Sequence, residues 1–153
     1  MTRINLVPPS ELYDQHLFAE FREIKMVPKS LARSLRAIES KVHAGMIHPH
    51  DSVGQLLQRI PKAFTLNTGH VSFFYDKGLY LQQRYSDLRR ELERRGINYN
   101  RDSLLDPDRV FLQDKRLAGD YTPTPEALAI IRARIAEKVA LKPDWYRYTG
   151  QRP

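Results

Sequence analysis

The sequence predicts an all-α protein, because apolar residues recur with the period of a helix in three long segments. The stretches between these segments carry few periodic apolar positions. A chain of 153 residues with 41% hydrophobic content can bury a substantial core. We therefore expect residues 1–153 to form a single compact domain of three main helices with long loops.

The first helical segment is predicted to begin at Ser10, an N-cap residue that follows two prolines. Asp14 falls in the first turn, where the helix dipole favours an anion. Pro28 interrupts the segment, so we expect a kink or a break between residues 26 and 28. Gly45 is its expected end. The apolar stripe consists of Leu17, Phe21, Ile24, Leu31, Leu35, Ile38 and Val42.

A second helix is predicted from about residue 69 to residue 95, with Gly96 as its stop. Before it, residues 45–63 are irregular and contain one short amphipathic piece, residues 51–59. After it, residues 97–122 are expected to form a long surface connection. The side chains expected to pack this connection are Leu104, Leu105, Val110, Phe111 and Leu112.

The third helix has a strong start signal in Thr124-Pro125-Glu126, an N-cap candidate followed by proline at the first helical position and an acid. Pro143 is expected to end it. The residues expected to face the core are Leu128, Ile131, Ile135 and Val139.

Basic residues outnumber acidic ones by 25 to 18, which gives a net charge of +7 and a pI near 9.8. A basic surface attracts polyanions such as nucleic acid. Residues 132–153 alone hold six basic and two acidic residues, together with Trp145, Tyr146 and Tyr148. Interleaved aromatic and basic side chains can stack on bases while holding phosphates, whereas the alternative interpretation is a surface that serves solubility.

The absence of cysteine excludes a disulfide framework, a thiol nucleophile and a thiolate zinc site. His43, His48 and His50 lack a regular ligand spacing, so we expect no metal and no other cofactor. No apolar run is long enough for a signal peptide or a membrane span. The expectation is a soluble, cytoplasmic monomer.

An α-amine at Thr2, exposed if Met1 is removed, is a candidate nucleophile. Its reference pKa is about 7.7 to 8.0, compared with about 10.4 for lysine, so an appreciable fraction is neutral at pH 7. Such a nucleophile needs an acid or base beside it. His16, Glu20 and Glu23 share one helix face, and a partly desolvated Glu can be tuned for proton transfer. The alternative interpretation is an ordinary solvated face.

Several blocks of sequence resemble the phage endonuclease V type of pyrimidine-dimer DNA glycosylase with abasic-site lyase activity. The resemblance extends over nearly the full length, and residues 25–63 depart from it most. The matching blocks are Thr2-Arg3-Ile4-Asn5-Leu6, Asp14-Gln15-His16-Leu17, Ala19-Glu20-Phe21-Arg22-Glu23, residues 69–77, Gly119-Asp120-Tyr121 and Trp145-Tyr146-Arg147-Tyr148.

The resemblance implies an all-α fold in which the N-terminal segment threads between helices to reach the active centre. It also implies that the α-amine of Thr2 attacks C1′ of the damaged nucleoside and forms an imine. Glu23 then assists opening of the sugar ring and abstracts the proton for β-elimination. The implied substrate is damaged double-stranded DNA, kinked and with one base extruded.

The resemblance further implies which residues bind DNA. Those near the lesion and its phosphates are Arg3, Gln15, His16 and Arg22, and those of the wider DNA surface are Arg134, Lys138, Trp145, Tyr146, Arg147 and Tyr148. Lys25-Met26 stands where the phage enzyme has Pro-Arg, so a phosphate-binding arginine is missing, and Lys25, Lys29 and Arg33 are the candidates to supply its charge. This departure leaves two alternatives open: a glycosylase and lyase for oxidised or ring-opened bases, and a non-catalytic basic DNA-binding protein.

Overall fold

The computed structural model describes residues 3–45 and 51–150, and these residues contain helices and no β-strand, which confirms the all-α prediction. Four 3-10 helices lie among the α-helices, at Pro9–Glu11, Ser72–Phe74, Val110–Leu112 and Lys115–Leu117. The α-helices of the described chain are α1 (Asp14–Glu23), α2 (Met26–His43), α3 (Ser52–Leu57), α4 (Gly78–Arg94) and α5 (Pro125–Leu141).

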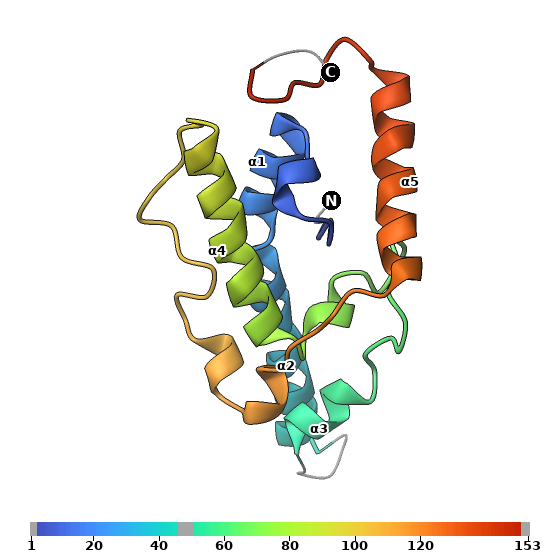
Figure 1. Cartoon of the computed structure of the whole chain (residues 1–153). Coiled ribbons are helices and arrows are strands. Elements are labelled where there is room, and N and C mark those ends of the chain that lie inside the picture. The colour runs from blue at the N-terminus through green and yellow to red at the C-terminus, as the bar shows by residue number, and fades with distance from the viewer. Residues whose placement is uncertain (1–2, 46–50, 151–153) are drawn as a thin grey trace.

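The described part of the N-terminal segment lies between α4 and α5 (Figure 1). Ile4 and Val7 are fully buried there, and Leu6 is nearly so. They join the hydrophobic core, in which α2 and α4 are the helices that bury the most side chains. The segment is therefore an integral part of the packing, and Arg3, which is only partly buried, stands at its described start.

The first predicted helical segment is two helices, with the break at Ile24 and Lys25. Pro28 lies just after the break, in the first turn of α2, where its missing N–H would have no helical partner in any case. The predicted end at Gly45 is confirmed, since this glycine adopts a φ of +73° just after the last turn.

The prediction that Ser10 caps this first helix is wrong. Residues 9–11 form a short 3-10 helix, and α1 begins only at Asp14. Between them Leu12 is extended, with φ −79° and ψ 142°, and its side chain is fully buried. Burial of Leu12 requires the chain to turn inward here, so the helix cannot run through from Ser10.

The second predicted helix starts at Gly78, nine residues later than the sequence pattern indicates. The carbonyl of Gly119 accepts hydrogen bonds from the amides of Leu79 and Tyr80, at 3.1 and 3.3 Å, and so caps α4 from a distant segment. The predicted stop at Gly96 is confirmed. The amides of Gly96 and Ile97 bond back into the last turn of α4, which is the Schellman arrangement.

The connection between α4 and α5 is packed only in part as predicted. Leu105, Val110 and Phe111 are buried, whereas Leu104 and Leu112 are 60% and 73% exposed, so the prediction for these two was wrong. Each of the two 3-10 helices of this connection buries some of its side chains and exposes the others. The spacing of apolar residues cannot predict which side chains are buried in helices as short as these.

Helix α5 begins as predicted, because the hydroxyl of Thr124 accepts a hydrogen bond from the amide of Ala127 at 3.1 Å. Ile131 is fully buried, and Leu128 and Ile135 pack at the edge of the core. The helix ends at Leu141, before Pro143. None of the helices in residues 3–45 and 51–150 is long and apolar enough to cross a membrane.

Candidate active site

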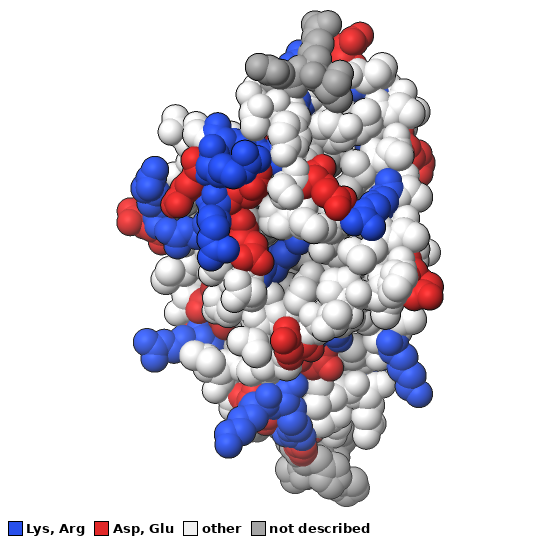
Figure 2. Space-filling model, in the orientation of Figure 1, with Lys and Arg blue, Asp and Glu red and all other residues white. Residues whose placement is uncertain are grey.

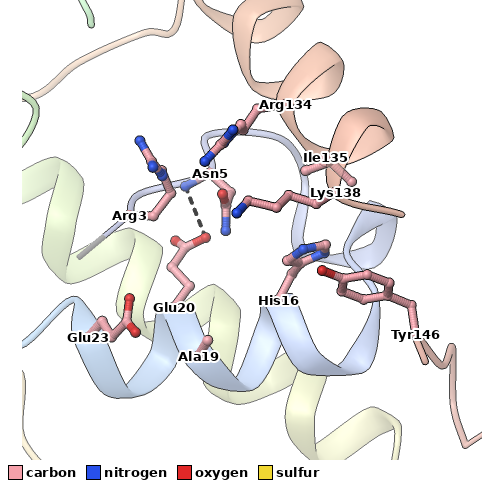
Figure 3. A pocket seen from close by; sticks show the side chains of 10 residues that line it. All are labelled: Arg3, Asn5, His16, Ala19, Glu20, Glu23, Arg134, Ile135, Lys138 and Tyr146. Carbon is pink, nitrogen blue, oxygen red and sulfur yellow. Dashed lines mark hydrogen bonds between the residues drawn. The ribbon is translucent and has the colours of Figure 1, made fainter. Parts of the chain in front are cut away.

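A hollow of about 390 Å³ opens between α1, α5 and the N-terminal segment (Figure 3). Charged and polar side chains from four separate parts of the chain point into it: the N-terminal segment, α1, α5 and the segment after α5. Its lining consists of Arg3, Asn5, His16, Ala19, Glu20, Glu23, Arg134, Ile135, Lys138 and Tyr146.

The buried end of the hollow is closed by an ion pair between Glu20 of α1 and Arg84 of α4. Both oxygens of Glu20 accept from the Arg84 guanidinium, at 2.6 and 2.9 Å, and one of them also accepts from the amide of Asn5 at 3.0 Å. A third guanidinium nitrogen donates to the carbonyl of Val7 at 2.5 Å. The planar guanidinium suits such a bidentate, fully buried pairing.

The N-terminal segment is also fastened on its other side, by His70. The amide of Ile4 donates to Nε2 of His70 at 2.9 Å, and Nδ1 lies 2.8 Å from the carbonyl of Thr65. The ring is therefore neutral, with its proton on Nδ1. Burial lowers the pKa of His70, and Arg3 lowers it further against the opposing effect of the Thr65 carbonyl.

Between Asn5 and Val7, the two residues held by the ion pair, the backbone reverses at Leu6, a buried non-glycine residue with φ +57°. The amide of Val7 bonds to the carbonyl of Asn5 at 2.5 Å across this residue. Such a three-residue turn is strained and persists only where its surroundings fix it. Here the strained turn directs residues 3–5 along the hollow.

Glu23 lies at the C-terminal end of α1, half-buried, and its carboxylate points toward the hollow (Figure 3). Unlike Glu20, it makes no hydrogen bond or ion pair with any residue that the structure describes. Its oxygens are thus able to accept a proton from a substrate. The two glutamates of one helix face thus differ in their contacts: Glu20 accepts from N–H donors, whereas Glu23 makes no such bond among the described residues.

Three cationic side chains, Arg3, Arg134 and Lys138, converge on the upper side of the hollow (Figure 3). Burial and the neighbouring charge of Arg134 lower the pKa of Arg3, whereas Glu23 opposes this effect. Arg3 also donates to the carbonyl of Leu66 at 3.0 Å. Because the like charges repel, an anion placed between them is stabilised, and a DNA phosphate meets that requirement.

His16 and Tyr146 form a stacked pair at the outer end of the hollow, with ring centroids 4.6 Å apart. Burial lowers the pKa of His16, and the charge of Lys138 lowers it further. Nδ1 of His16 is buried and has no hydrogen-bond partner among residues 3–45 and 51–150. The stacked rings therefore form part of the wall of the hollow, with Nδ1 of His16 shielded from solvent.

A family model described as pyrimidine dimer DNA glycosylase matches residues 1–106. The chain belongs to the pyrimidine dimer DNA glycosylase family. The resemblance seen in the sequence blocks is thereby confirmed, and with it an enzyme of DNA repair whose substrate is DNA. The matched range contains the N-terminal segment and α1 to α4, and therefore Glu20, Glu23 and Arg84. Helix α5, with Arg134 and Lys138, lies beyond it.

In this member of the family, five of the residues expected to act on DNA line the hollow: Arg3, His16, Arg134, Lys138 and Tyr146. Of the two expected catalytic residues, Glu23 lines it too, and Thr2 lies outside the described residues.

Four further expected DNA-binding residues lie elsewhere in the fold. Gln15 binds the C-terminal segment, donating to the carbonyl of Trp145 at 2.5 Å and accepting from the amide of Arg147 at 2.9 Å. The Tyr148 hydroxyl donates to the carbonyl of Ser10 at 2.7 Å, and the Arg147 guanidinium donates to backbone carbonyls. Only Trp145 presents most of its ring to solvent, being 54% exposed.

Arg22 and Lys25 also stay outside the hollow. Arg22 is exposed, with its guanidinium 5.8 Å from the centre of the Phe18 ring. The amine of Lys25 donates to the hydroxyl of Ser103 at 2.9 Å. Lys25 is therefore held by the loop after α4. Of Arg3, Arg22 and Lys25, only Arg3 brings its positive charge into the hollow with Glu23.

Sequence reasoning missed three residues of this site: Asn5, His70 and Arg84. Arg84 carried a signal, because it falls on the buried stripe of α4 one position before Tyr85, where a charged residue requires a partner. Glu20 occupies the matching buried position on α1. Asn5 acts through its backbone amide, so no side-chain pattern could reveal it.

The net positive charge is not spread over the whole surface. Over the C-terminal end of α4, blue and red side chains are interleaved (Figure 2). Glu91 binds both Arg94 and Arg95, at 2.5 and 2.8 Å, and Asp87 binds Arg90 at 3.3 Å. Paired charges of this kind contribute little to phosphate binding. In the hollow the cations outnumber the carboxylates, although Arg134 also lies 3.5 Å from Glu137.

Among the described residues no group of three or more His, Asp or Glu side chains is arranged to hold a metal ion. His43 is the last residue of α2, whereas His48 and His50 lie outside the described residues.

Proposed function

We propose that this family member is a pyrimidine-dimer DNA glycosylase with abasic-site lyase activity, in which the α-amine of Thr2 is the nucleophile and Glu23 the base. One observation carries the proposal. Glu23, with its oxygens unpaired among the described residues, and Arg3, the first described residue, line the same hollow with two further cations. This arrangement supports the proposal because Thr2 directly precedes Arg3 in the sequence.

The chemistry proceeds by nucleophilic and general-base catalysis. The amine nitrogen bonds to C1′ while the glycosidic bond breaks and its electron pair leaves with the base. The ring then opens: the bond from C1′ to the ring oxygen breaks as a proton passes from the bound amine to that oxygen. This leaves a protonated imine, which withdraws electrons from C2′. Glu23 removes a C2′ proton, and the bond from C3′ to its oxygen breaks, which releases the 3′ phosphate.

The DNA strand is held by charge and stacking. Arg3, Arg134 and Lys138 bind the phosphates that flank the lesion, and the stacked pair of His16 and Tyr146 borders the sugar and base. Trp145 adds an exposed ring for stacking. The remaining proposed DNA-binding residues act at the rim of the hollow or support the segment that carries Trp145 and Tyr146. These residues are Gln15, Arg22, Lys25, Arg147 and Tyr148.

Borohydride trapping tests the proposal. The purified protein is mixed with duplexes that carry a cyclobutane pyrimidine dimer, an abasic site or an oxidised pyrimidine, and the reduced adduct is mapped by mass spectrometry. We expect an adduct on the Thr2 peptide with the first two duplexes. An adduct on a lysine would overturn the nucleophile assignment. Release of the oxidised base in preference to the dimer would assign the site to the alternative substrate.

A further inference from the structure

The ion pair of Glu20 and Arg84 is buried in the floor of the site, yet the proposed chemistry uses neither residue. Their side chains are 0% and 5% exposed. Two opposite charges removed from water cost several kcal/mol in desolvation, which the pairing only partly offsets, so a buried ion pair is poor evidence of a stabilising role. Its contacts indicate a different purpose.

Two hydrogen bonds connect this pair to the backbone of the N-terminal segment. Glu20 accepts from the amide of Asn5 at 3.0 Å, and Arg84 donates to the carbonyl of Val7 at 2.5 Å. These two backbone groups flank Leu6, the residue with φ +57°. The ion pair therefore bridges the strained turn from both sides.

The charges of the pair are mutually dependent. Burial opposes the charge of Arg84, and the carboxylate of Glu20 outweighs that effect, so the pKa of Arg84 is raised above its ordinary value. All three hydrogen bonds to the oxygens of Glu20 come from N–H donors. Glu20 is thereby kept as an acceptor for Asn5 and does not compete with Glu23, its neighbour one turn along α1.

We propose that Arg84 is a positioning residue, which through Glu20 and the Val7 carbonyl fixes the turn at Leu6 and so sets the chain terminus against Glu23. The proposal rests on the proposed function, because it assigns Arg84 the task of placing the nucleophile. Arg84 itself touches no substrate.

The test compares Arg84→Lys with the wild-type protein in two measurements. Lysine keeps the positive charge, but its ammonium is a single point and cannot reproduce the planar fork whose three nitrogens reach both Glu20 oxygens and the Val7 carbonyl. Hydrogen exchange of the peptide that contains residues 4–7 reports the placement alone. The single-turnover cleavage rate of an abasic duplex at saturating protein reports the chemistry. Binding is measured with a tetrahydrofuran abasic duplex, which cannot react.

In Arg84→Lys we expect faster exchange at residues 4–7 and an affinity for the unreactive duplex within about twofold of the wild type. We expect the cleavage rate to fall by a factor on the order of one hundred, because a displacement of the nucleophile near 1 Å lowers the rate by about that much. The control is Ile38→Ala, a fully buried change in α2 far from the turn, which should lower the melting temperature and leave exchange at residues 4–7 and the cleavage rate nearly unchanged.

If Arg84→Lys does not fold, the pair Glu20→Gln with Arg84→Gln replaces it, because two amides leave no uncompensated charge. Unchanged exchange at residues 4–7 would overturn the positioning role, as would an equal loss of rate in Ile38→Ala. Faster exchange with an undiminished cleavage rate would overturn it as well. A wild-type borohydride adduct on a lysine would instead refute the proposed function, while the exchange measurement would still report on the anchoring.

Discussion

The amide of Ile4 donates to Nε2 of His70 at 2.9 Å, so this imidazole can hold the N-terminal segment only in its neutral form. Its other nitrogen lies 2.8 Å from the carbonyl of Thr65, which can only accept. A second proton would occupy Nε2, opposite an N–H group, and the bond to Ile4 would be broken. His70 thus links the placement of the segment to pH.

The stability of the protein should therefore fall as the pH drops below about 6.5, the reference pKa of histidine. Burial lowers the pKa of folded His70, so below pH 6.5 the unfolded chain binds a proton that the folded chain does not. The stabilisation contributed by neutral His70 is complete above about pH 6.5. It is lost progressively as the pH falls to the pKa that His70 has in the folded protein. Arg3 and Glu20 are the charged groups that act on the ring, with opposite signs.

The measurement is the melting temperature between pH 5 and pH 8 for the wild type and His70→Gln. Glutamine can accept from Ile4 and donate to Thr65 without titrating. We expect a flatter profile below pH 6.5 in the variant, although His16, whose pKa is also lowered, contributes equally to both proteins. Identical profiles would show that His70 does not couple the segment to pH.

Glu23→Gln should retain DNA binding and lose strand cleavage, because the amide keeps the shape of the side chain and cannot take a proton. General-base catalysis contributes about 10² to 10⁴-fold in rate, and a loss in that range is expected for a single turnover on an abasic duplex. Glu39→Gln, an exposed change on α2, is the matched control. Appreciable cleavage by Glu23→Gln would remove this residue from its proposed role.

The sequence was sufficient where a single segment carries the information. Thr124 and Gly96 mark helix ends through local hydrogen bonds, so the pattern located both. The start of α4 was misplaced because its capping acceptor is the carbonyl of Gly119, which lies about forty positions along the chain. The prediction that Ser10 caps the first helix failed for a similar reason, because the burial of Leu12 depends on the tertiary fold.

The candidate site, like the fold, was predictable only where one segment carries the information. Glu20 and Glu23 could be placed on one helix face from their spacing, but only the fold shows that Arg84 engages the first and leaves the second available. Gln15 and Lys25 have the residue types of DNA contacts, yet the structure holds each of them by a distant partner, the Trp145 carbonyl and Ser103. Pairings over such separations leave no periodic trace in a single sequence.

Arg134→Ala and Lys138→Ala should weaken binding to every duplex and flatten its salt dependence. Removal of one phosphate-binding cation should reduce the slope of log K against log salt by roughly 0.9. Arg132→Ala on the same helix is the control, because Arg132 faces Glu11 at 2.8 Å and lies outside the hollow. An unchanged slope in both test variants would move the DNA to another face of the protein.

The position of the nucleophile is tested by extending the chain before Thr2 with a residue that processing does not remove. Arg3 lines the hollow, and Ile4 and Asn5 are fastened to His70 and Glu20, so the added residue cannot be absorbed by sliding the segment. The terminal amine is then displaced by one residue, a span of about 3.3 to 3.6 Å. A misplacement near 1 Å already costs about a hundredfold in rate.

We therefore expect the extended protein to bind an unreactive abasic duplex normally and to cleave a reactive one at least about a hundredfold more slowly. The melting temperature should be unchanged, because the anchored residues 4–7 remain in place. Borohydride should trap the processed protein on its Thr2 peptide and the extended protein hardly at all. Normal cleavage by the extended form, or an adduct on Lys25, Lys29 or Lys77, would mean that a lysine is the nucleophile.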